Sequence, residues 1–393
     1  MVFRKLILIV AIVAFSKGLK AQQLNYATAD SITYAQYMAG DWHALKRTGN
    51  EALKSGIDFP YLRLRIAYAH FMEANYGGAL KQYQAVLKNN SFDETARLYS
   101  YWCNEYLNRT DEASYHASKM GDSTLMKNGI KPFSILQVGI ESSFKIPSAA
   151  LRGNASYNRF YISNRLFLKL KLEQSASFYN QKFAFFTRKN LAEEPVYNTN
   201  QQLAYYAKLS YPVTASISFI GAYHYLQNNY AGTIYQNQVA LVGVKLSKPY
   251  YEVQGDADLS KMANANVNQY NLGLTVYPRG NLNLYTVSRL SLQNQLAHKY
   301  LMFTQIAGAR VSKSTWLEAN ATLGRLNNYL EADAVYVYNS IDQTLFKTGA
   351  TAFVSLNKHL LIHVNYAFER KENAYEPYRY SQNSITGGST WKF

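Results

Sequence analysis

The sequence predicts a two-domain chain of the α+β class, in which an N-terminal α-helical repeat domain is followed by a transmembrane antiparallel β-barrel. Three observations support this fold class. A short apolar segment near the N-terminus is typical of export, helical residues recur in the first third of the chain, and apolar residues alternate at period two in the remainder. The expected boundaries are residues 1–21 for a signal peptide, 24–127 for the helices and 132–393 for the barrel.

The N-terminal segment has the organisation of a secretory signal peptide. Arg4 and Lys5 precede an apolar run over residues 6–15, and this run is shorter than the ~20 residues that a membrane-spanning helix needs. A cut after Ala21 would leave a mature chain beginning at Gln22. A short buried helix of the folded domain is the alternative. No other apolar stretch approaches about 18 residues, so we expect no membrane-spanning helix.

The predicted helical domain, at about 24–127, repeats itself. Ala44, Ala79 and Ala113 lie in similar segments and are spaced by 35 and 34 positions. A small residue here lets the two helices of a hairpin approach closely, and about three such units are the fewest that bury a shared core. The spacing resembles that of tetratricopeptide repeat (TPR) domains, which implies a concave surface for a protein partner; a plain helical bundle is the alternative. The aromatic residues expected between repeats and on that surface are Tyr68, Tyr83, Tyr99 and Trp102.

From about residue 132 onward, the pattern is that of strands. Leu360 and Ile362, for example, alternate with polar residues such as His363, in segments of about 10–14 residues separated by turns. Tight turns, including one predicted at 163–165, alternate with longer connections, of which the longest lies near 181–199. Short turns at one rim and longer loops at the other are typical of outer-membrane barrels.

The number of strands is about 14. The segment 316–345 is ambiguous, because Trp316–Tyr338 fits either one long bent strand or a strand plus an extra hairpin, so 12 and 16 strands stay open. The composition agrees with a barrel, since the chain has 35 Tyr and 15% aromatic residues. Tyrosines are common where the outer face of a barrel meets the lipid headgroups.

The C-terminal strand ends in aromatic residues. Trp391 and Phe393 resemble the terminal assembly signal of bacterial outer-membrane barrels, which implies insertion by a barrel-assembly machinery. Taken with the repeat spacing and the strand alternation, the chain resembles outer-membrane proteins that join a TPR segment to a barrel, the YaiO-like type common in Bacteroidota. That resemblance implies a Gram-negative outer membrane, with the helical domain in the periplasm and lipid or lipopolysaccharide around the barrel.

The chain is basic, with a formal charge of +16. The basic residues form no dense cluster, so we expect no nucleic-acid partner. Part of the excess is expected to line the barrel and to favour anions there. The candidate lumen residues are Lys169, Lys171, Arg310, Arg325 and His363.

Nothing in the sequence indicates an active site. The HExxH, CxxC, GxSxG and Walker patterns are absent, and the His and Ser residues have no local pattern that marks a nucleophile and its base. We therefore predict no catalytic residue, cofactor or metal site, and no enzyme. A lipid-modifying barrel hydrolase with a Ser–His pair at the lipid boundary is the least favoured alternative.

Two functional hypotheses follow. The first is an anchored accessory or scaffold component of an outer-membrane complex for secretion, barrel assembly or polysaccharide export, because a simple pore has no need of a repeat domain. The alternative is a channel for small solutes, with a preference for anions. The sequence does not identify the partner or the solute, and it leaves open whether the lumen is clear.

Overall fold

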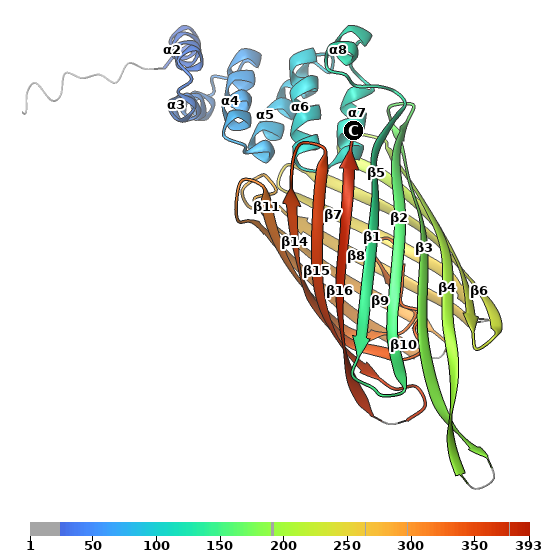
Figure 1. The fold of residues 1–393 in the computed structure, drawn as a ribbon. Helices are drawn as coiled ribbons and strands as arrows, with labels where there is room; N and C mark the ends of the chain where they lie inside the picture. The colour runs from blue at the N-terminus through green and yellow to red at the C-terminus, as the bar shows by residue number, and fades with distance from the viewer. Residues whose placement is uncertain (1–23, 190–191, 264, 297, 377) are drawn as a thin grey trace, which may run out of the picture.

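The helices and strands follow the predicted order along the chain. The computed structural model describes residues 24–393 apart from 190–191, 264, 297 and 377, so the predicted signal peptide lies outside the described residues. Figure 1 shows the helices at one rim of the barrel, beside the C-terminus, while the hairpin of β3 (Leu170–Lys189) and β4 (Ala192–Pro212) projects beyond the other rim. We call these rims the helical end and the far end.

Seven helices in the described part of the chain form the N-terminal domain, and none of the described helices is long and apolar enough to cross a membrane. Corresponding helices of successive hairpins begin 34 residues apart, as their bounds show. They are α2 (Tyr26–Met38), α3 (Trp42–Lys54), α4 (Pro60–Met72), α5 (Tyr76–Asn89), α6 (Glu94–Tyr106), α7 (Thr110–Ala117) and the short α8 (Asp122–Lys127). With this interval, Ala44 in one repeat corresponds to Gly78 in the next and not to Ala79, which is one residue away from the predicted alignment.

Side-chain caps define where four of these helices begin. Asn25, Asp41, Asn75 and Asp93 each accept a hydrogen bond from the backbone N–H three residues ahead. Such a cap satisfies one of the free N–H groups at a helix start and contributes about 1 kcal/mol. Short polar residues therefore mark the starts of α2, α3, α5 and α6.

Fourteen strands in the described residues close into one antiparallel barrel, which confirms the predicted strand number. Each strand pairs with its neighbour along the chain, except that β11 pairs with β14, and β1 pairs with β16 to close the ring. Besides β3 and β4, the barrel strands are β1 (Ser134–Pro147), β2 (Arg152–Leu166), β5 (Ile217–Tyr230), β6 (Thr233–Lys248), β7 (Tyr251–Met262), β8 (Ala265–Val276), β9 (Leu284–Gln295), β10 (His298–Arg310), β11 (Thr315–Leu326), β14 (Gln343–Ser355), β15 (Leu360–Glu372) and β16 (Arg379–Lys392).

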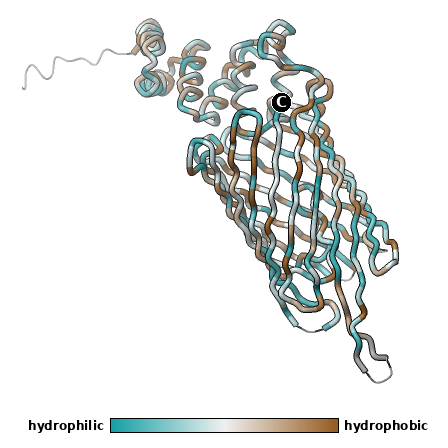
Figure 2. Tube along the Cα trace, in the orientation of Figure 1, coloured by the Kyte–Doolittle hydropathy of each residue, from teal (hydrophilic) through white to brown (hydrophobic). Residues whose placement is uncertain are grey.

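The outer face of the barrel is apolar. Along the strands, apolar positions (brown in Figure 2) alternate with polar ones. The exposed large apolar side chains include Ile140, Phe160, Phe178, Leu203, Phe219, Val242, Leu272, Leu290, Leu301, Leu317, Val364 and Ile385. An apolar exterior around a polar interior is the pattern that suits a barrel surrounded by lipid.

Three local expectations for the barrel need correction or completion. The connection expected near 181–199 is mostly strand, because β3 and β4 stay paired as far as Lys189 and Ala192. The predicted turn at 163–165 is wrong: β2 runs on to Leu166, which pairs with Leu170, and the turn is made by 167–169. Phe167 and Leu168 adopt positive φ angles of 52° and 61°, a conformation that their residue types rarely adopt. The ambiguous region 316–345 contains one barrel strand followed by a small hairpin, β12 (Leu330–Glu331) with β13 (Tyr336–Val337).

The helical domain is docked on the barrel. The backbone N–H of Gly77 donates to the carbonyl of Gly280 in the β8–β9 connection at 2.9 Å. Tyr277 of the same connection belongs to the buried cluster that contains Tyr83 and Leu107 of the helices. The two domains therefore share an apolar core, and the helices lie across part of the helical end.

Candidate functional site

Residues 327–342, which connect β11 to β14, fold back into the barrel; we call them the plug. The plug contains the β12–β13 hairpin and carries three buried apolar or aromatic side chains, Tyr329, Leu330 and Ala334, each exposed by 2% or less. Leu330 and Ala334 pack against wall residues of β6 to β8. Part of the segment that the sequence left ambiguous thus lies in the interior of the barrel.

The tip of the plug is held by its acidic residue. The Asp333 carboxylate accepts hydrogen bonds from Lys208 at 3.2 Å and from Gln254 at 2.8 Å, and Arg289 Nη1 lies 3.4 Å away. The backbone is held as well, since Tyr206 donates to the Asp333 carbonyl at 2.9 Å. Strands β4, β7 and β9 therefore converge on one carboxylate.

The backbone of this tip is in a costly conformation. Ala332, Asp333 and Ala334 have φ angles of 53°, 57° and 63°. For residues other than glycine, the left-handed region costs roughly 1–2 kcal/mol each, so the contacts to the wall must offset several kcal/mol. A segment strained in one position and held there by polar contacts can change position when those contacts are weakened.

The stem of the plug is fixed near the far end. The Asp342 carboxylate pairs with the Arg152 guanidinium through hydrogen bonds of 2.6 and 2.9 Å, and it accepts a further bond from Tyr380 at 2.5 Å. Both partners of the ion pair are almost fully buried. Bidentate geometry makes this the strongest kind of ion pair, so the stem anchors the plug while the tip rests on weaker contacts.

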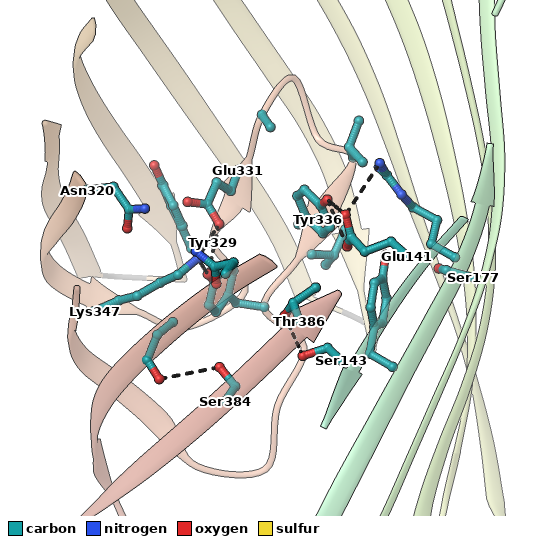
Figure 3. A pocket seen from close by; sticks show the side chains of 18 of the residues that line it. Glu141, Ser143, Ser177, Asn320, Tyr329, Glu331, Tyr336, Lys347, Ser384 and Thr386 are labelled. Atoms are coloured by element: carbon teal, nitrogen blue, oxygen red, sulfur yellow. Dashed lines mark hydrogen bonds and ion pairs between the residues drawn. The ribbon is translucent and has the colours of Figure 1, made fainter. Parts of the chain in front are cut away.

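A polar chamber of about 650 Å³ remains between the plug and the wall. Its wall runs from Phe353 and Thr390, close to the helical end, to Lys371 and Gln382, close to the far end. Figure 3 shows Glu141 and Tyr336 directed toward one another, and Lys347 directed toward Glu331. The plug thus narrows the barrel without filling it.

Most charges in the chamber face an opposite charge. Lys347 pairs with Glu331 at 3.0 Å, while Glu369 lies between Lys371 at 3.4 Å and Lys145 at 3.8 Å. Buried charges need such partners, because an unpaired charge in a low-dielectric interior is costly. The chamber is therefore polar and close to neutral rather than uniformly basic.

Helix α7 closes part of the helical end. Lys245 of β6 lies 2.8 Å from Asp111 and 3.4 Å from Glu112. Ser210 and Ser247 donate to the same two carboxylates, each at 2.6 Å. Burial raises the pKa of Asp111, but Lys245 outweighs it and brings the pKa to about 2. Asp111 is therefore ionised at neutral pH, and the contacts of the two carboxylates tie α7 to the barrel wall.

Acidification is expected to loosen this helix through a histidine on its other side. Burial, with a smaller contribution from Arg97, lowers the pKa of His116 from 6.5 to about 3. The folded domain holds His116 neutral, so this stability is complete above pH 6.5 and is lost as pH falls toward 3. At pH 5 the loss should be about 2 kcal/mol.

The urea midpoint of the helical circular-dichroism signal measures this, compared at pH 7 and pH 5. His116→Gln should flatten the dependence on pH, whereas the same change at the exposed His43 should leave it intact. An unchanged midpoint in the wild-type protein between pH 7 and pH 5 would contradict the expectation.

The predicted lumen residues divide into two groups. His363 lines the chamber, and Lys171 pairs inside the barrel with Glu173 at 2.7 Å. The other three do not lie in the lumen. Lys169 belongs to the β2–β3 turn and contacts Tyr211, Arg310 donates to carbonyls of the β10–β11 turn, and Arg325 is exposed on the outward-facing register of β11. Their positions at strand ends explain the error, since charge is tolerated at both rims.

The predicted partner-binding aromatics are partly core. Tyr83 is 1% exposed and belongs to the shared apolar core, so it is not a surface residue. Tyr68 and Tyr99 lie edge to face with ring centroids 5.4 Å apart, and Trp102 packs on Tyr101. These aromatics continue into an exposed face of α2, α4 and α6, which we call the aromatic face. Its exposed members are Tyr34, Met38, Met72 and Tyr106.

The predicted assembly residues lie at the helical end. The Trp391 ring stacks on His359 at 5.3 Å, and the backbone N–H of Phe393 donates to the carbonyl of Leu136 at 3.1 Å. Both aromatic side chains are exposed. The terminal residue thus continues the pairing that closes the barrel, while its role in assembly stays a prediction.

Several residues that shape the interior carry little signal in the sequence. Asp333, Arg152 and Arg159 are single charged residues without a motif, and no spacing marks them. For Arg159 one signal was available, because period two on β2 places it on the same face as Tyr157 and Tyr161. The plug offered no such signal, since its residues follow neither period.

No protein-family model matches the chain. No curated protein sequence matches it either. Among solved structures, the toluene transporter TodX of Pseudomonas putida superposes with a TM-score of 0.45 at 8% identity, covering 73% of this chain and 98% of that one. The Acinetobacter baumannii outer membrane protein Omp33 superposes with a TM-score of 0.39 at 7% identity, covering 66% of this chain and 99% of that one. The translocator domain of autotransporter NalP from Neisseria meningitidis has a TM-score of 0.36 at 13% identity, covering 66% of this chain and 89% of that one. The chain is similar to these proteins in barrel architecture alone.

Proposed function

We propose that the chain is an outer-membrane channel for small polar solutes, closed at rest by the plug, with its helical domain in the periplasm. The observation that carries the proposal is the polar chamber beside a plug whose tip is held by hydrogen bonds and ion pairs. A solute path needs an aqueous, polar wall, and a gate needs contacts that can be exchanged for water. The apolar outer face supports the membrane location.

Planar-bilayer conductance tests the proposal, with Asp333→Asn as the diagnostic variant. The wild-type protein should open briefly, and the variant should raise the open fraction by roughly tenfold to 100-fold, because hydrogen bonds to charged groups contribute about 1.5–3 kcal/mol each. Lys208 keeps Glu173 at 2.8 Å and Arg289 keeps Asp256 at 2.8 Å, so the barrel wall is not left with unpaired cations.

Asp122→Asn, an exposed change on α8, is the matched control and should behave as wild type. Absence of conductance in the wild-type protein and in Asp333→Asn alike would contradict the channel and favour a closed anchor. Each variant removes one negative charge from the wild-type protein. A difference in conductance between them therefore reports the plug and not the net charge of the protein.

A second candidate is a scaffold, favoured by the aromatic face and by the 34-residue interval of the helices. Under this candidate the helical domain is TPR-like and binds a protein partner in the periplasm or outer membrane. The YaiO-like type and a source among the Bacteroidota belong to it and rest on the sequence resemblance. A stoichiometric partner that copurifies in mild detergent, and is lost with Tyr106→Ala but kept with Phe92→Ala outside that face, would support it.

A further inference from the structure

One guanidinium in the chamber differs from the other charges there. Arg159 of β2 has a side chain that is 14% exposed, and its guanidinium carbon lies 4.8 Å from the ring centre of Tyr161 and 5.0 Å from that of Tyr336. The two tyrosines, one on the wall and one on the plug, hold the planar group by cation–π contact. They fix its position without occupying any of its hydrogen-bond donors.

The donors of Arg159 lack a close acceptor. Among the described residues its buried Nε has no hydrogen-bond partner. The carboxylate nearest to Nη2 is that of Glu141, at 3.9 Å, which is beyond hydrogen-bond length. Glu141 is instead held by Tyr336, whose hydroxyl lies 3.1 Å from both carboxylate oxygens (Figure 3). An oriented guanidinium with open donors is therefore presented to the chamber.

The surroundings suit a small solute with hydroxyl groups and one acidic group. Side chains with hydroxyl groups, among them Tyr157, Ser143 and Thr386, line the same cavity. A guanidinium binds carboxylate and phosphate oxygens through two parallel hydrogen bonds, which a lysine does not reproduce. Glu141 nearby keeps the local charge balanced, so binding should be moderate, as a permeating solute requires.

We propose that Arg159 is the recognition group of the chamber and that the solute carries an oxyanion, either a carboxylate or a phosphate. This inference rests on the proposed channel and names its substrate class. It differs from the sequence-based expectation of a generally basic lumen, because a single oriented guanidinium selects a chemical group, whereas diffuse positive charge selects only sign.

Calorimetric titration of the full-length protein in detergent tests the inference, with glucuronate, glucose 6-phosphate and glucose as probes. The two acids should bind about tenfold more tightly than glucose, and Arg159→Gln should weaken their binding by about tenfold or more. Arg159→Lys keeps the positive charge but lacks the paired donors of the guanidinium, so its affinity for the two acids should lie between those of wild type and Arg159→Gln. Arg325→Gln, an equal charge change on the outer face, should bind as wild type.

Binding of only one acid would support the site and narrow its class. Equal binding of glucose and the acids, or unchanged binding in Arg159→Gln, would overturn it. The channel and the site can fail separately. If the protein conducts but binding does not depend on Arg159, the proposed site is wrong. If binding depends on Arg159 but the protein does not conduct, the proposed channel is wrong.

Discussion

Replacing residues 330–337 by Asn-Gly is expected to leave the barrel open most of the time. The change removes the tip of the plug, including Asp333 and Tyr336, but keeps the stem. The backbone N–H of Tyr338 donates to the carbonyl of Tyr329 at 2.9 Å, so these residues already form the end of a hairpin that a two-residue turn can close. Asp342 stays in place for Arg152.

The expected effect is large because the tip, with its contacts to the wall, is then absent, although the stem keeps its ion pair with Arg152. The buried contacts of Leu330 and Ala334 disappear together with the hydrogen bonds of Asp333. If the plug keeps the wild-type channel closed for about 99% of the time, its removal raises the open fraction on the order of 100-fold. Planar-bilayer recordings measure this directly.

The control is a similar shortening elsewhere on the same barrel. Phe185 and Val196 pair directly across the β3–β4 hairpin, so replacing 186–195 by Asn-Gly also closes on an existing pair. This hairpin projects beyond the far end (Figure 1), away from the chamber. Its shortening should leave conductance unchanged. Equal conductance in the tip replacement and in wild type would show that the plug does not gate the lumen.

The barrel could be predicted from the sequence because alternate residues of each strand face the lipid and the lumen, and are apolar and polar accordingly. Leu360, Ile362 and His363 show the rule, and β15, which contains them, lies between β14 and β16 in the barrel. The plug could not be predicted. Its interior position depends on contacts with Lys208 and Arg289, which lie far away in the chain.

Errors at the rims have a different physical origin. The Ser-Asn-Arg sequence at 163–165 has the composition of a turn, whereas the real turn contains Phe167 and Leu168 at positive φ. Tertiary packing decided against local preference there, because Leu168 joins the apolar cluster beneath α6 and α7. The shift removed Lys169 from the strand and from the expected lumen.

In the helical domain, the repeat interval could be predicted but the role of each aromatic residue could not. Repetition shows which positions are equivalent, yet the last hairpin packs on a barrel instead of on a fourth repeat. Tyr83 of α5 is buried between neighbouring helices, where its ring stacks on that of Tyr99 of α6 at 5.7 Å, and Tyr277 of the barrel joins the same cluster. The repeat pattern does not show which of its aromatic positions are core and which are surface.

Lys245→Met is expected to release the helical domain from the barrel mouth. The change leaves Asp111 and Glu112 buried at 6% and 1% exposure, with two serine hydroxyls but without their ion-pair partner among the described residues. Removing one partner of a buried ion pair costs about 3–5 kcal/mol, which corresponds to a 100-fold or greater rise in the detached population, since each 1.4 kcal/mol is about tenfold. Hydrogen exchange of the α7 amides in the full-length protein should accelerate accordingly.

Lys248→Met provides the matched comparison, because it removes the same charge three residues further along, where the side chain is exposed and only the backbone carbonyl serves the interface through Arg109. It should leave exchange in α7 unchanged. Equal protection of α7 in both variants would mean that the apolar core around Tyr277 alone holds the domain. Faster exchange in Lys245→Met alone would place the attachment in the ionic contacts of α7, whose strength, unlike that of the apolar core, depends on charge. The helical domain would then be held as a detachable cover of the barrel, and weakening its ion pairs would open the helical end independently of the plug.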